Sequence, residues 1–454
     1  MKEDTGQEEI DVSAFHKYSK GSQNTPPVPV DILEFPMAEY LKTVLKIIVI
    51  AGKPYIYHRG YYRIDEDGAA LMNQIKALIY PELVSVSRIN RVYELLVRDY
   101  ALRKEIDEVN RHPKCWINFR NGMFDVREWK MHEHDPKYLS INQVPHEFIP
   151  NAPYNGSVAE KFIGGLIPKL DDQEMLFEWF GYCMTPDTCF QKYFMFTGPP
   201  GAGKSVILWL QEQVVGKENV CSISLQDLNK RFYPTNLFGK LLNVCADIPS
   251  TALEQVDVIK KITGEDVVMG EYKGGKVFKF RPYAKQSFSA NEIPINRDEK
   301  SRALYRRMLI LKTEGRGEYI ENLKAGLALS LPAVIYESVV ALNHAYENGR
   351  LTESEQSKVE VLELYKSSDS VMAFLVDCTE RREGAKIERK KLYDLYVAYT
   401  MEEEIPFPCS KKGFFANLRK KGYAEVKIDG IRYFKGIEQT FEERDLDGRP
   451  FKSD

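Results

Sequence analysis

Apolar and polar residues follow a regular succession through the middle of the chain. From about residue 159 to residue 312, short apolar runs typical of buried strands alternate with segments of helical periodicity. The first strong run, KYFMFTG at residues 192–198, is followed by a glycine-rich turn and the helical segment VILWLQEQVV. Because strands that alternate with helices usually pair in parallel, this pattern predicts a parallel β-sheet covered by helices.

The segment before this region has a mixed pattern. Apolar residues recur with helical spacing between Leu71 and Tyr100, and strand-like stretches follow at residues 116–126 and 138–148. A small α+β domain is expected here. After the central region, residues 318–366 are helical in pattern, with Pro332 as the expected break because proline interrupts a helix beyond its first turn.

Beyond Asp369 the pattern predicts a compact unit of helices and a hairpin. Ser410 is the expected N-cap of a helix that packs Phe414 and Leu418 inward, and Asp429–Gly430 is a typical two-residue hairpin turn. The preceding helix has one apolar face, made of Leu392, Leu395, Tyr396 and Tyr399.

The length of the chain suits roughly three domains. The patterns divide it into six segments, three of which are domains and three a leader, a linker and a tail. The expected segments are a flexible leader (1–30), an α+β collar or docking domain (31–154), the α/β core (155–315), a helical linker (316–368), a DNA-binding unit (369–437) and an acidic tail (438–454).

Composition and charge exclude several classes of protein. The 63 Lys and Arg residues nearly balance 66 Asp and Glu residues, and the formal charge of -3 excludes a globally basic DNA-coating protein. The longest apolar stretches, such as residues 47–52, are too short for a membrane span, and the first residues do not resemble an export signal. Seven scattered cysteines without a CxxC pair suggest reduced thiols, so a cytoplasmic location is expected.

The most specific motif is a phosphate-binding loop of the form GxxxxGK[ST] between the apolar run and the helix that follows. In such a loop, backbone amides surround the phosphates, the lysine neutralises their oxygens and the hydroxyl binds Mg²⁺. The motif predicts binding of a nucleotide with Mg²⁺, and does not by itself distinguish a small-molecule kinase, a GTPase or a motor. Its residues are Gly198, Pro199, Pro200, Gly201, Ala202, Gly203, Lys204 and Ser205.

Three candidate partners of this loop follow along the chain. Asp247 ends the apolar run LLNVCAD, where a Mg²⁺-binding carboxylate is expected, although a strand can also end in an ordinary turn aspartate. Asn291 ends a second run and could orient the attacking water, or simply form a turn. Arg306 and Arg307 suit either a solvated face or arginine fingers that act across a subunit boundary.

Two basic segments are candidates for contact with nucleic acid. Gly274–Gly275 predicts a hairpin whose tip is bracketed by Lys273 and Lys276, which taken alone equally suit a solvated turn. Residues 410–437 hold eight basic and two acidic residues, which favours DNA over the alternative of a solvated helix surface. The candidate cations of this second segment are Lys411, Lys412, Arg419, Lys420, Lys421 and Arg432.

The order and spacing of GPPGAGKS, LLNVCAD, IKKITGEDVV with its basic hairpin, FSANEIP and YRRM resemble the superfamily III DNA helicase core. More narrowly, the chain resembles the helicase half of the phage, plasmid and poxvirus primase–helicase family. WINFRNGMFDVREWKMHEHDPKYLSINQVPHEFIPNA is similar to the end of that family's domain before the helicase, and the last segment is similar to its winged-helix tail.

The resemblance implies an AAA+ P-loop core, a winged-helix domain and a role for each motif. It implies that Lys204 and Ser205 form Walker A, that Asp247 is Walker B, and that Asn291 is the sensor. Arg306 or Arg307 would act on a neighbouring subunit, and Lys273 and Lys276 would lie on a DNA-gripping hairpin in the pore of a ring.

Two features of the chain depart from the family's pattern. Many members carry two adjacent acids at the Walker B position, whereas here Ala246 precedes Asp247, so the catalytic base is open between Asp247, Glu265 and Asp266. The chain also lacks motifs for a polymerising primase domain, so helicase activity without priming is expected.

The sequence therefore predicts a hexameric, ATP-dependent replicative helicase of a phage or mobile element, moving 3′ to 5′ on single-stranded or forked DNA as the resemblance implies. A primase or other replication proteins are expected partners, and the bacterial cytoplasm is the expected location. One alternative is an origin-binding AAA+ initiator or scaffold that assembles on duplex DNA without processive unwinding. Another is a P-loop phosphotransferase acting on a small molecule.

Overall fold

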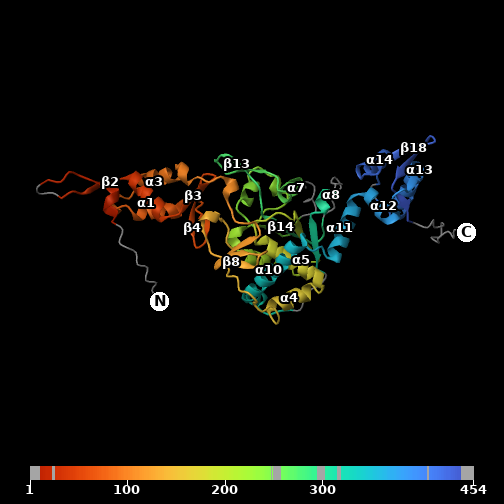
Figure 1. Ribbon diagram of the computed structural model, residues 1–454, viewed down its shortest axis with the longest axis horizontal. Helices are drawn as coiled ribbons and strands as arrows, with labels where there is room; N and C mark the ends of the chain where they lie inside the picture. The colour runs from red at the N-terminus through yellow and green to blue at the C-terminus, as the bar shows by residue number, and fades with distance from the viewer. Residues whose placement is uncertain are drawn as a thin grey trace.

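The computed structural model describes residues 11–440 apart from 23–25, 247, 249–256, 294–301, 314–318 and 406–407. The molecule is elongated (Figure 1). The N-terminal elements lie at one end, a parallel sheet with its helices occupies the centre, and a C-terminal unit lies at the other end. The central sheet is therefore the scaffold between two outer units.

The central sheet confirms the predicted parallel arrangement. Its strands are all parallel in the order β10-β11-β14-β9-β15. They are β9 (Tyr193–Thr197), β10 (Val220–Cys221), β11 (Leu242–Cys245), β14 (Lys285–Ala290) and β15 (Met308–Lys312). Helix α6 (Lys204–Val215) begins the connection from β9, an inner strand of the sheet, to β10 at its edge.

Alternating side chains of β9 form two separate cores, one on each face of the sheet. Phe194 and Phe196 pack on one face, whereas Tyr193 and Met195 pack on the other. The first face is covered by α4 (Val158–Leu166), α5 (Leu170–Cys183), α6, α9 (Leu323–Leu329) and α10 (Leu331–Asn348). The second face is covered by α7 (Asp257–Thr263), α8 (Arg302–Tyr305) and α11 (Glu355–Ser368).

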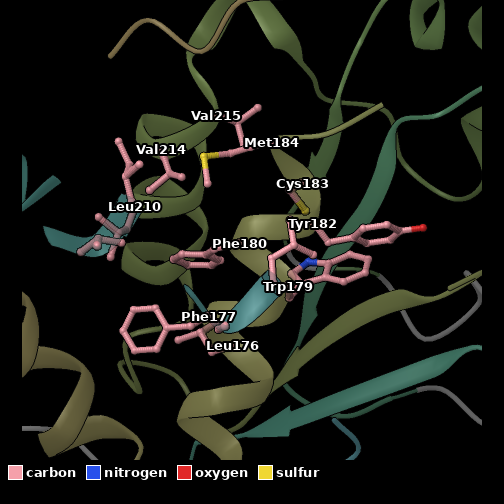
Figure 2. Packing of buried hydrophobic residues seen from close by; sticks show 14 of the residues in the cluster. Leu176, Phe177, Trp179, Phe180, Tyr182, Cys183, Met184, Leu210, Val214 and Val215 are labelled. Atoms are coloured by element: carbon pink, nitrogen blue, oxygen red, sulfur yellow. The ribbon is translucent and has the colours of Figure 1, made fainter. Parts of the chain in front are cut away.

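Helix α5 lies inside the first core and is buried along most of its length. Figure 2 shows its Phe180 near Leu210 and Val214 of α6, and its Trp179 beside Tyr182 of the same helix. The indole N–H of Trp179 donates to Ser287 Oγ at 2.8 Å, which satisfies the one polar atom of this side chain. Glu178, also fully buried, accepts hydrogen bonds from the backbone N–H (2.5 Å) and hydroxyl (2.9 Å) of Thr352. These bonds fix the connection between α10 and α11.

The N-terminal part combines helices with two antiparallel meanders, as the mixed pattern predicted. Its helices are α1 (Glu34–Val44), α2 (Ala69–Ala77) and α3 (Val86–Arg98), and Pro81 lies in the break between α2 and α3. Its meanders are β3 (Ile47–Ile50), β4 (Lys53–His58) and β5 (Tyr61–Ile64), then β6 (Trp116–Phe119), β7 (Gly122–Asp125) and β8 (Lys130–His132).

The structure differs from the sequence-based expectation in two places of this part. Residues 138–148 form no strand, because their backbone bonds go to separate segments: Ser140 O accepts from Tyr62 N–H, Tyr138 O from Arg111 N–H and His146 O from Arg120 N–H. Within the expected leader, β1 (His16–Tyr18) pairs with β2 (Pro29–Ile32), and Phe15 is buried against Tyr40. Phe15 and the buried His16, whose ring centre lies 4.1 Å from that of Tyr80, thus anchor a segment whose composition suggested flexibility.

The second meander shares its core with the central sheet. Ile117, Phe119 and Phe124 belong to the same buried cluster as the residues of α5 and α6. A buried polar network reinforces this junction, since Asn142 donates to Asn219 Oδ1 and accepts from the hydroxyl of Tyr283. The meander and the sheet are therefore packed as one body.

The helical segment that follows the sheet breaks where proline predicted. Pro332 lies in the first turn of α10, and α9 and α10 meet at an angle of 61°. No single helix in the described ranges is long and apolar enough to cross a membrane, and only the bent pair α9–α10 has the required length and composition. The seven cysteines, all within the described ranges, form no disulfide.

The C-terminal unit, residues 370–440, has a core of its own. It contains α12 (Ser370–Cys378), α13 (Arg389–Glu402), α14 (Lys411–Lys420) and the antiparallel sheet β17-β19-β18, formed by β17 (Lys386–Glu388), β18 (Glu425–Ile428) and β19 (Ile431–Lys435). The predicted hairpin turn is confirmed, since Asp429 and Gly430 both have positive φ between β18 and β19. Short strands β16 (Thr379–Glu380) and β20 (Glu438–Gln439) also pair, so two residues of the expected tail belong to the fold.

Candidate functional site

The glycine-rich loop joins the end of β9 to the start of α6, as predicted. Gly198 has a φ of 139°, and a Cβ there would lie 2.1 Å from the carbonyl oxygen of Thr313, so only glycine fits. Gly203, with a φ of 74°, is the N-cap of α6, and no side chain caps this helix. The first amides of α6 therefore point outward without a capping partner, which is the arrangement that binds phosphate.

Lys204 and Asn291, predicted to act together, meet in the structure. Lys204 is buried at the start of α6, and its Nζ donates to Asn291 Oδ1 at 3.0 Å. It also donates to the carbonyl oxygens of Gly198 (2.5 Å) and Pro199 (3.0 Å). These acceptors are all neutral, so a phosphate oxygen would bind this ammonium more strongly than they do.

The other predicted residues of the loop surround this pair. Ser205 is exposed in the first turn of α6, beside Lys204, while Pro199, Pro200 and Gly201 form an exposed tip and Ala202 is buried. Asp247 lies outside the described residues; β11, which precedes it, ends at Cys245 on the same edge of the sheet. Among the described residues, the free amides of the loop and the ammonium of Lys204 suit the phosphates of ATP. The hydroxyl of Ser205 suits one coordination position of Mg²⁺.

The topology of the sheet also favours the carboxyl ends of its strands, where the glycine-rich loop begins, as a ligand site. The connection that leaves β9 leads toward β10 at one edge, whereas the connection that leaves β14 crosses to β15 at the other edge. In open parallel sheets, ligands bind beyond the carboxyl ends of strands whose connections diverge in this way. The glycine-rich loop and Asn291 lie at these two strand ends.

Arg306 and Arg307 lie at the opposite end of the sheet from the loop. They directly precede β15, whose first residue, Met308, pairs with Tyr193, the first residue of β9. The loop follows the last residue of β9, so the length of a five-residue strand, roughly 17 Å at 3.3–3.4 Å per residue, separates the arginines from it. An arginine side chain cannot span this distance, so neither arginine serves the loop of its own chain.

The two arginines differ in their surroundings. Arg306 is exposed, whereas Arg307 is half-buried beside Gly264. Burial and the neighbouring charge of Arg306 lower the pKa of Arg307, while Asp266 raises it. Glu265 accepts a hydrogen bond from the hydroxyl of Thr188, just before β9, so both candidate bases other than Asp247 lie at this end of the sheet, away from the loop.

Lys192 holds the arginine turn in place, a role the sequence did not suggest. Its Nζ donates to the carbonyl oxygen of Arg306 and to Glu353 Oε1, both at 2.6 Å. Glu353 lies just before α11, which leads to the C-terminal unit. No local pattern signals this contact, because its three residues come from segments more than 40 positions apart along the chain.

The predicted lysine-tipped hairpin is present. Strands β12 (Val268–Glu271) and β13 (Val277–Phe280) pair antiparallel, and Lys273 and Lys276 are exposed at the turn between them. One side of the hairpin contacts the N-terminal part, where Lys53 Nζ lies 5.6 Å from the ring centre of Tyr272. The two tip lysines thus face solvent on an anchored support.

The predicted cations of the C-terminal unit have different surroundings. Lys411, Lys412 and Lys420 are exposed on α14. Two others, Arg419 and Arg432, are exposed but form ion pairs with Glu425. Lys421 forms a 2.8 Å ion pair with the buried Asp369 and donates to the hydroxyl of Tyr365 at 3.1 Å. The charge of Lys421 is therefore already compensated inside the protein.

Two protein-family models match separate parts of the chain. Residues 37–168 match a family model described as D5 N terminal like, and residues 196–307 match a family of unknown function, DUF5906. An uncharacterized mitochondrial protein, ymf21 of Marchantia polymorpha, is 26% identical over 131 residues, which cover 26% of this chain and 71% of that protein. The D5-like match supports the resemblance of the N-terminal part to primase–helicases.

Solved structures of the NrS-1 C-terminal region have a similar fold. One apo structure superimposes with a TM-score of 0.54 at 11% identity and covers 88% of this chain and 98% of that one. Another apo structure of the region, residues 305–718, gives a TM-score of 0.52 at 12% identity and covers 89% and 99%. At this identity the likeness shows the fold, including the mixed α/β arrangement with a parallel central sheet.

Proposed function

We propose that this protein is an ATP-dependent DNA helicase that acts in the replication of a phage or other mobile element and hydrolyses ATP between the subunits of a ring. The observation that carries the proposal is the contact between Lys204 Nζ and Asn291 Oδ1 at an uncapped helix N-terminus. The match of residues 37–168 to the D5 N-terminal-like model supports the replication context.

Each residue of the site has a distinct task in this proposal. The amides of α6 and the ammonium of Lys204 bind the phosphates, and Ser205 and Asp247 hold Mg²⁺, which neutralises charge on the phosphate oxygens. Asn291, next to Lys204, orients the attacking water. Because Glu265 and Asp266 lie at the other end of the sheet, Asp247 is the proposed base.

Arg306 is the proposed arginine finger. It is exposed and lies a strand's length from its own loop, so it can contact only the nucleotide of another copy. Arg307 is held beside Gly264 and Asp266 and is proposed to support the turn. A finger supplied in this way contributes about 10³ to 10⁵ in rate, because it stabilises the charge that develops on the transferred phosphoryl group.

DNA contact is proposed at two places. Lys273 and Lys276 would hold the phosphates of a single strand from the tip of the β12–β13 hairpin. In the C-terminal unit, the order of α12, β17, α13, α14 and the β18–β19 hairpin supports a winged-helix domain, with α14 as the helix that faces DNA. Lys411 and Lys412, exposed at the start of α14, are its proposed phosphate contacts.

The central test is ATP binding and hydrolysis with and without single-stranded DNA. Lys204→Met should lose both, whereas Asn291→Ala should keep nucleotide binding and lose most hydrolysis, since the residue orients water rather than phosphate. Lys217→Ala, beyond the far end of α6, is the matched control and should behave as wild type. Hydrolysis that ignores DNA, or that survives Asn291→Ala, would refute the assignment and favour a small-molecule phosphotransferase.

Shared catalysis has its own test. Arg306→Ala subunits and Lys204→Met subunits should each be inactive alone, yet mixtures should recover part of the ATPase activity, because some interfaces then pair an intact loop with an intact arginine. Absence of rescue in mixtures that co-assemble would show that each site is complete within one chain.

The alternative, an initiator that assembles on duplex DNA, rests on the location of α14. Its cations lie at the far end of the molecule from the N-terminal part (Figure 1), where they can bind a duplex independently of the hairpin. Forked and fully duplex substrates separate the two functions. ATP-dependent strand displacement supports the helicase, whereas tight duplex binding without displacement supports the initiator.

A further inference from the structure

A groove of about 1380 Å³ separates the central core from the C-terminal unit. Arg306 and residues of α11, including Val361, line one wall, and Val376, Arg381 and Lys420 line the other. We call it the interdomain groove. It contains the proposed finger but none of the residues of the glycine-rich loop.

The interdomain groove combines an apolar lining with a cationic rim. Val361 and Met372 are half-buried in it. Arg306, Arg381 and Lys420 are exposed, and none of the three forms an ion pair with any residue in the described ranges. Glu353 also lines the groove but is paired with Lys192. Cations without an ion-pair partner among the described residues, beside apolar side chains, fit a partner that brings negative charge together with a small apolar contact.

The end of the central sheet that carries the glycine-rich loop offers both negative charge and a small apolar surface. The tip of the glycine-rich loop exposes Pro199 and Pro200, and Glu292 is exposed directly after Asn291. A nucleoside triphosphate bound to the loop would add several negative charges beside them. The exposed prolines and Glu292 of this end of the sheet, together with a bound triphosphate, therefore complement the cations of the groove.

We propose that the interdomain groove is the docking surface for a second copy of this chain, which presents the loop-bearing edge of its central sheet. This inference rests on the proposed function and extends it. Arg381 and Lys420 of the C-terminal unit then join Arg306 around the neighbour's triphosphate, so the C-terminal unit helps to complete the nucleotide site as well as binding DNA.

The two walls of the groove are held at a defined spacing. The rings of Tyr305 and Tyr365 stack with their centres 4.7 Å apart, which joins the arginine turn to α11. Lys421 donates to the hydroxyl of Tyr365 and forms an ion pair with Asp369, which joins α11 to the end of α14. A surface with both walls fixed in this way is preorganised to receive a partner.

A photo-crosslinker placed in the groove identifies the occupant. Benzoylphenylalanine at Val376, which is 38% exposed, should crosslink in the presence of ATP and Mg²⁺ to peptides 198–206 or 291–293. Mixing isotope-labelled with unlabelled chains should show that these crosslinks join two copies. The matched position Met401, 74% exposed on α13 and outside the groove, should give none of them.

The other possible occupants would each overturn the proposal. Crosslinks from position 376 to residues 441–454 of the same chain would assign the groove to its own C-terminal segment, and crosslinks to added DNA would assign it to nucleic acid. Absence of crosslinks between copies, in protein shown to oligomerise, would also refute it.

A charge reversal measures how much the C-terminal wall of the groove contributes to ATP hydrolysis. Arg381→Glu with Lys420→Glu should lower ATPase without DNA at least tenfold, while Lys390→Glu with Lys391→Glu, exposed on α13 and outside the groove, should not. Unchanged ATPase in the first pair would overturn the proposal. If wild-type protein hydrolyses no ATP yet gives the crosslinks between copies, the docking surface stands and the proposed function fails. If it hydrolyses ATP normally but gives no crosslink between copies, the proposed ATPase function stands and the docking surface fails.

Discussion

Replacing Glu178 with glutamine should remove a large pH dependence from the folding stability of the central core. Glu178 is fully buried in α5, where its carboxyl group accepts two hydrogen bonds from Thr352. Burial raises the pKa of this carboxyl group from its usual 4.5 to about 7, although the bonds from Thr352 act in the opposite direction. The folded protein therefore keeps a proton that the unfolded chain loses.

The sign and size of the effect follow from this difference in pKa. Between pH 4.5 and 7 the unfolded chain binds fewer protons than the folded one, so the free energy of unfolding falls as the pH rises. At 1.36 kcal/mol per pH unit, the shift to about 7 corresponds to a loss of about 3 kcal/mol by pH 8. A glutamine amide can accept from the backbone N–H of Thr352 and donate to its hydroxyl, so the variant keeps the contact without the charge.

Urea unfolding at intervals from pH 4.5 to pH 8 measures the effect. Glu178→Gln should match wild type near pH 4.5 and become more stable than wild type by up to about 3 kcal/mol at pH 8. Glu347→Gln, at an exposed position of α10, is the control and should leave the pH profile of stability unchanged. Parallel profiles for wild type and Glu178→Gln would show that this carboxyl group ionises normally, and would refute the reasoning.

Three other outcomes are expected. Alanine at both Lys273 and Lys276 should impair unwinding more than basal ATPase and reduce the salt slope of single-strand binding by roughly 1.4, whereas equal loss of both activities would indicate misfolding. Lys421→Met should destabilise the protein by about 3 to 5 kcal/mol, because it leaves Asp369 buried without its cation; an unchanged urea midpoint with weaker DNA binding would instead place this lysine on DNA. Burial lowers the pKa of Lys285 to about 8, so stability should rise between pH 8 and 10.5 in wild type but stay level in Lys285→Met, and equal slopes would contradict this.

Local patterns in the sequence predicted the features that depend on nearby residues. The parallel sheet, the turns at Gly274–Gly275 and Asp429–Gly430, and the break at Pro332 were all confirmed, because each depends on strand periodicity or on the φ preferences of a few residues. Asn291 was predicted as a candidate partner of the glycine-rich loop, and its Oδ1 lies 3.0 Å from Lys204 Nζ; its role in hydrolysis stays a prediction.

Features that depend on distant parts of the chain were not predictable in this way. The expected strand at residues 138–148 lacks a partner strand, because its bonding groups are used by several separate segments. Phe15 is buried through contact with a helix that begins beyond the expected leader. Lys192 reaches Arg306 and Glu353 only once the sheet has formed, and the interdomain groove exists only because α11 sets the C-terminal unit beside the core.

The separation of Arg306 from the glycine-rich loop also restricts the symmetry of any assembly that uses both. An isologous dimer brings identical patches together, whereas here the two complementary patches lie at opposite ends of the same strands. A two-fold dimer can join them only by placing two chains side by side in antiparallel directions. Heterologous contacts, in contrast, repeat from one subunit to the next. They end in a closed ring if the rotation per subunit divides a full circle, and otherwise they continue as an open helical filament.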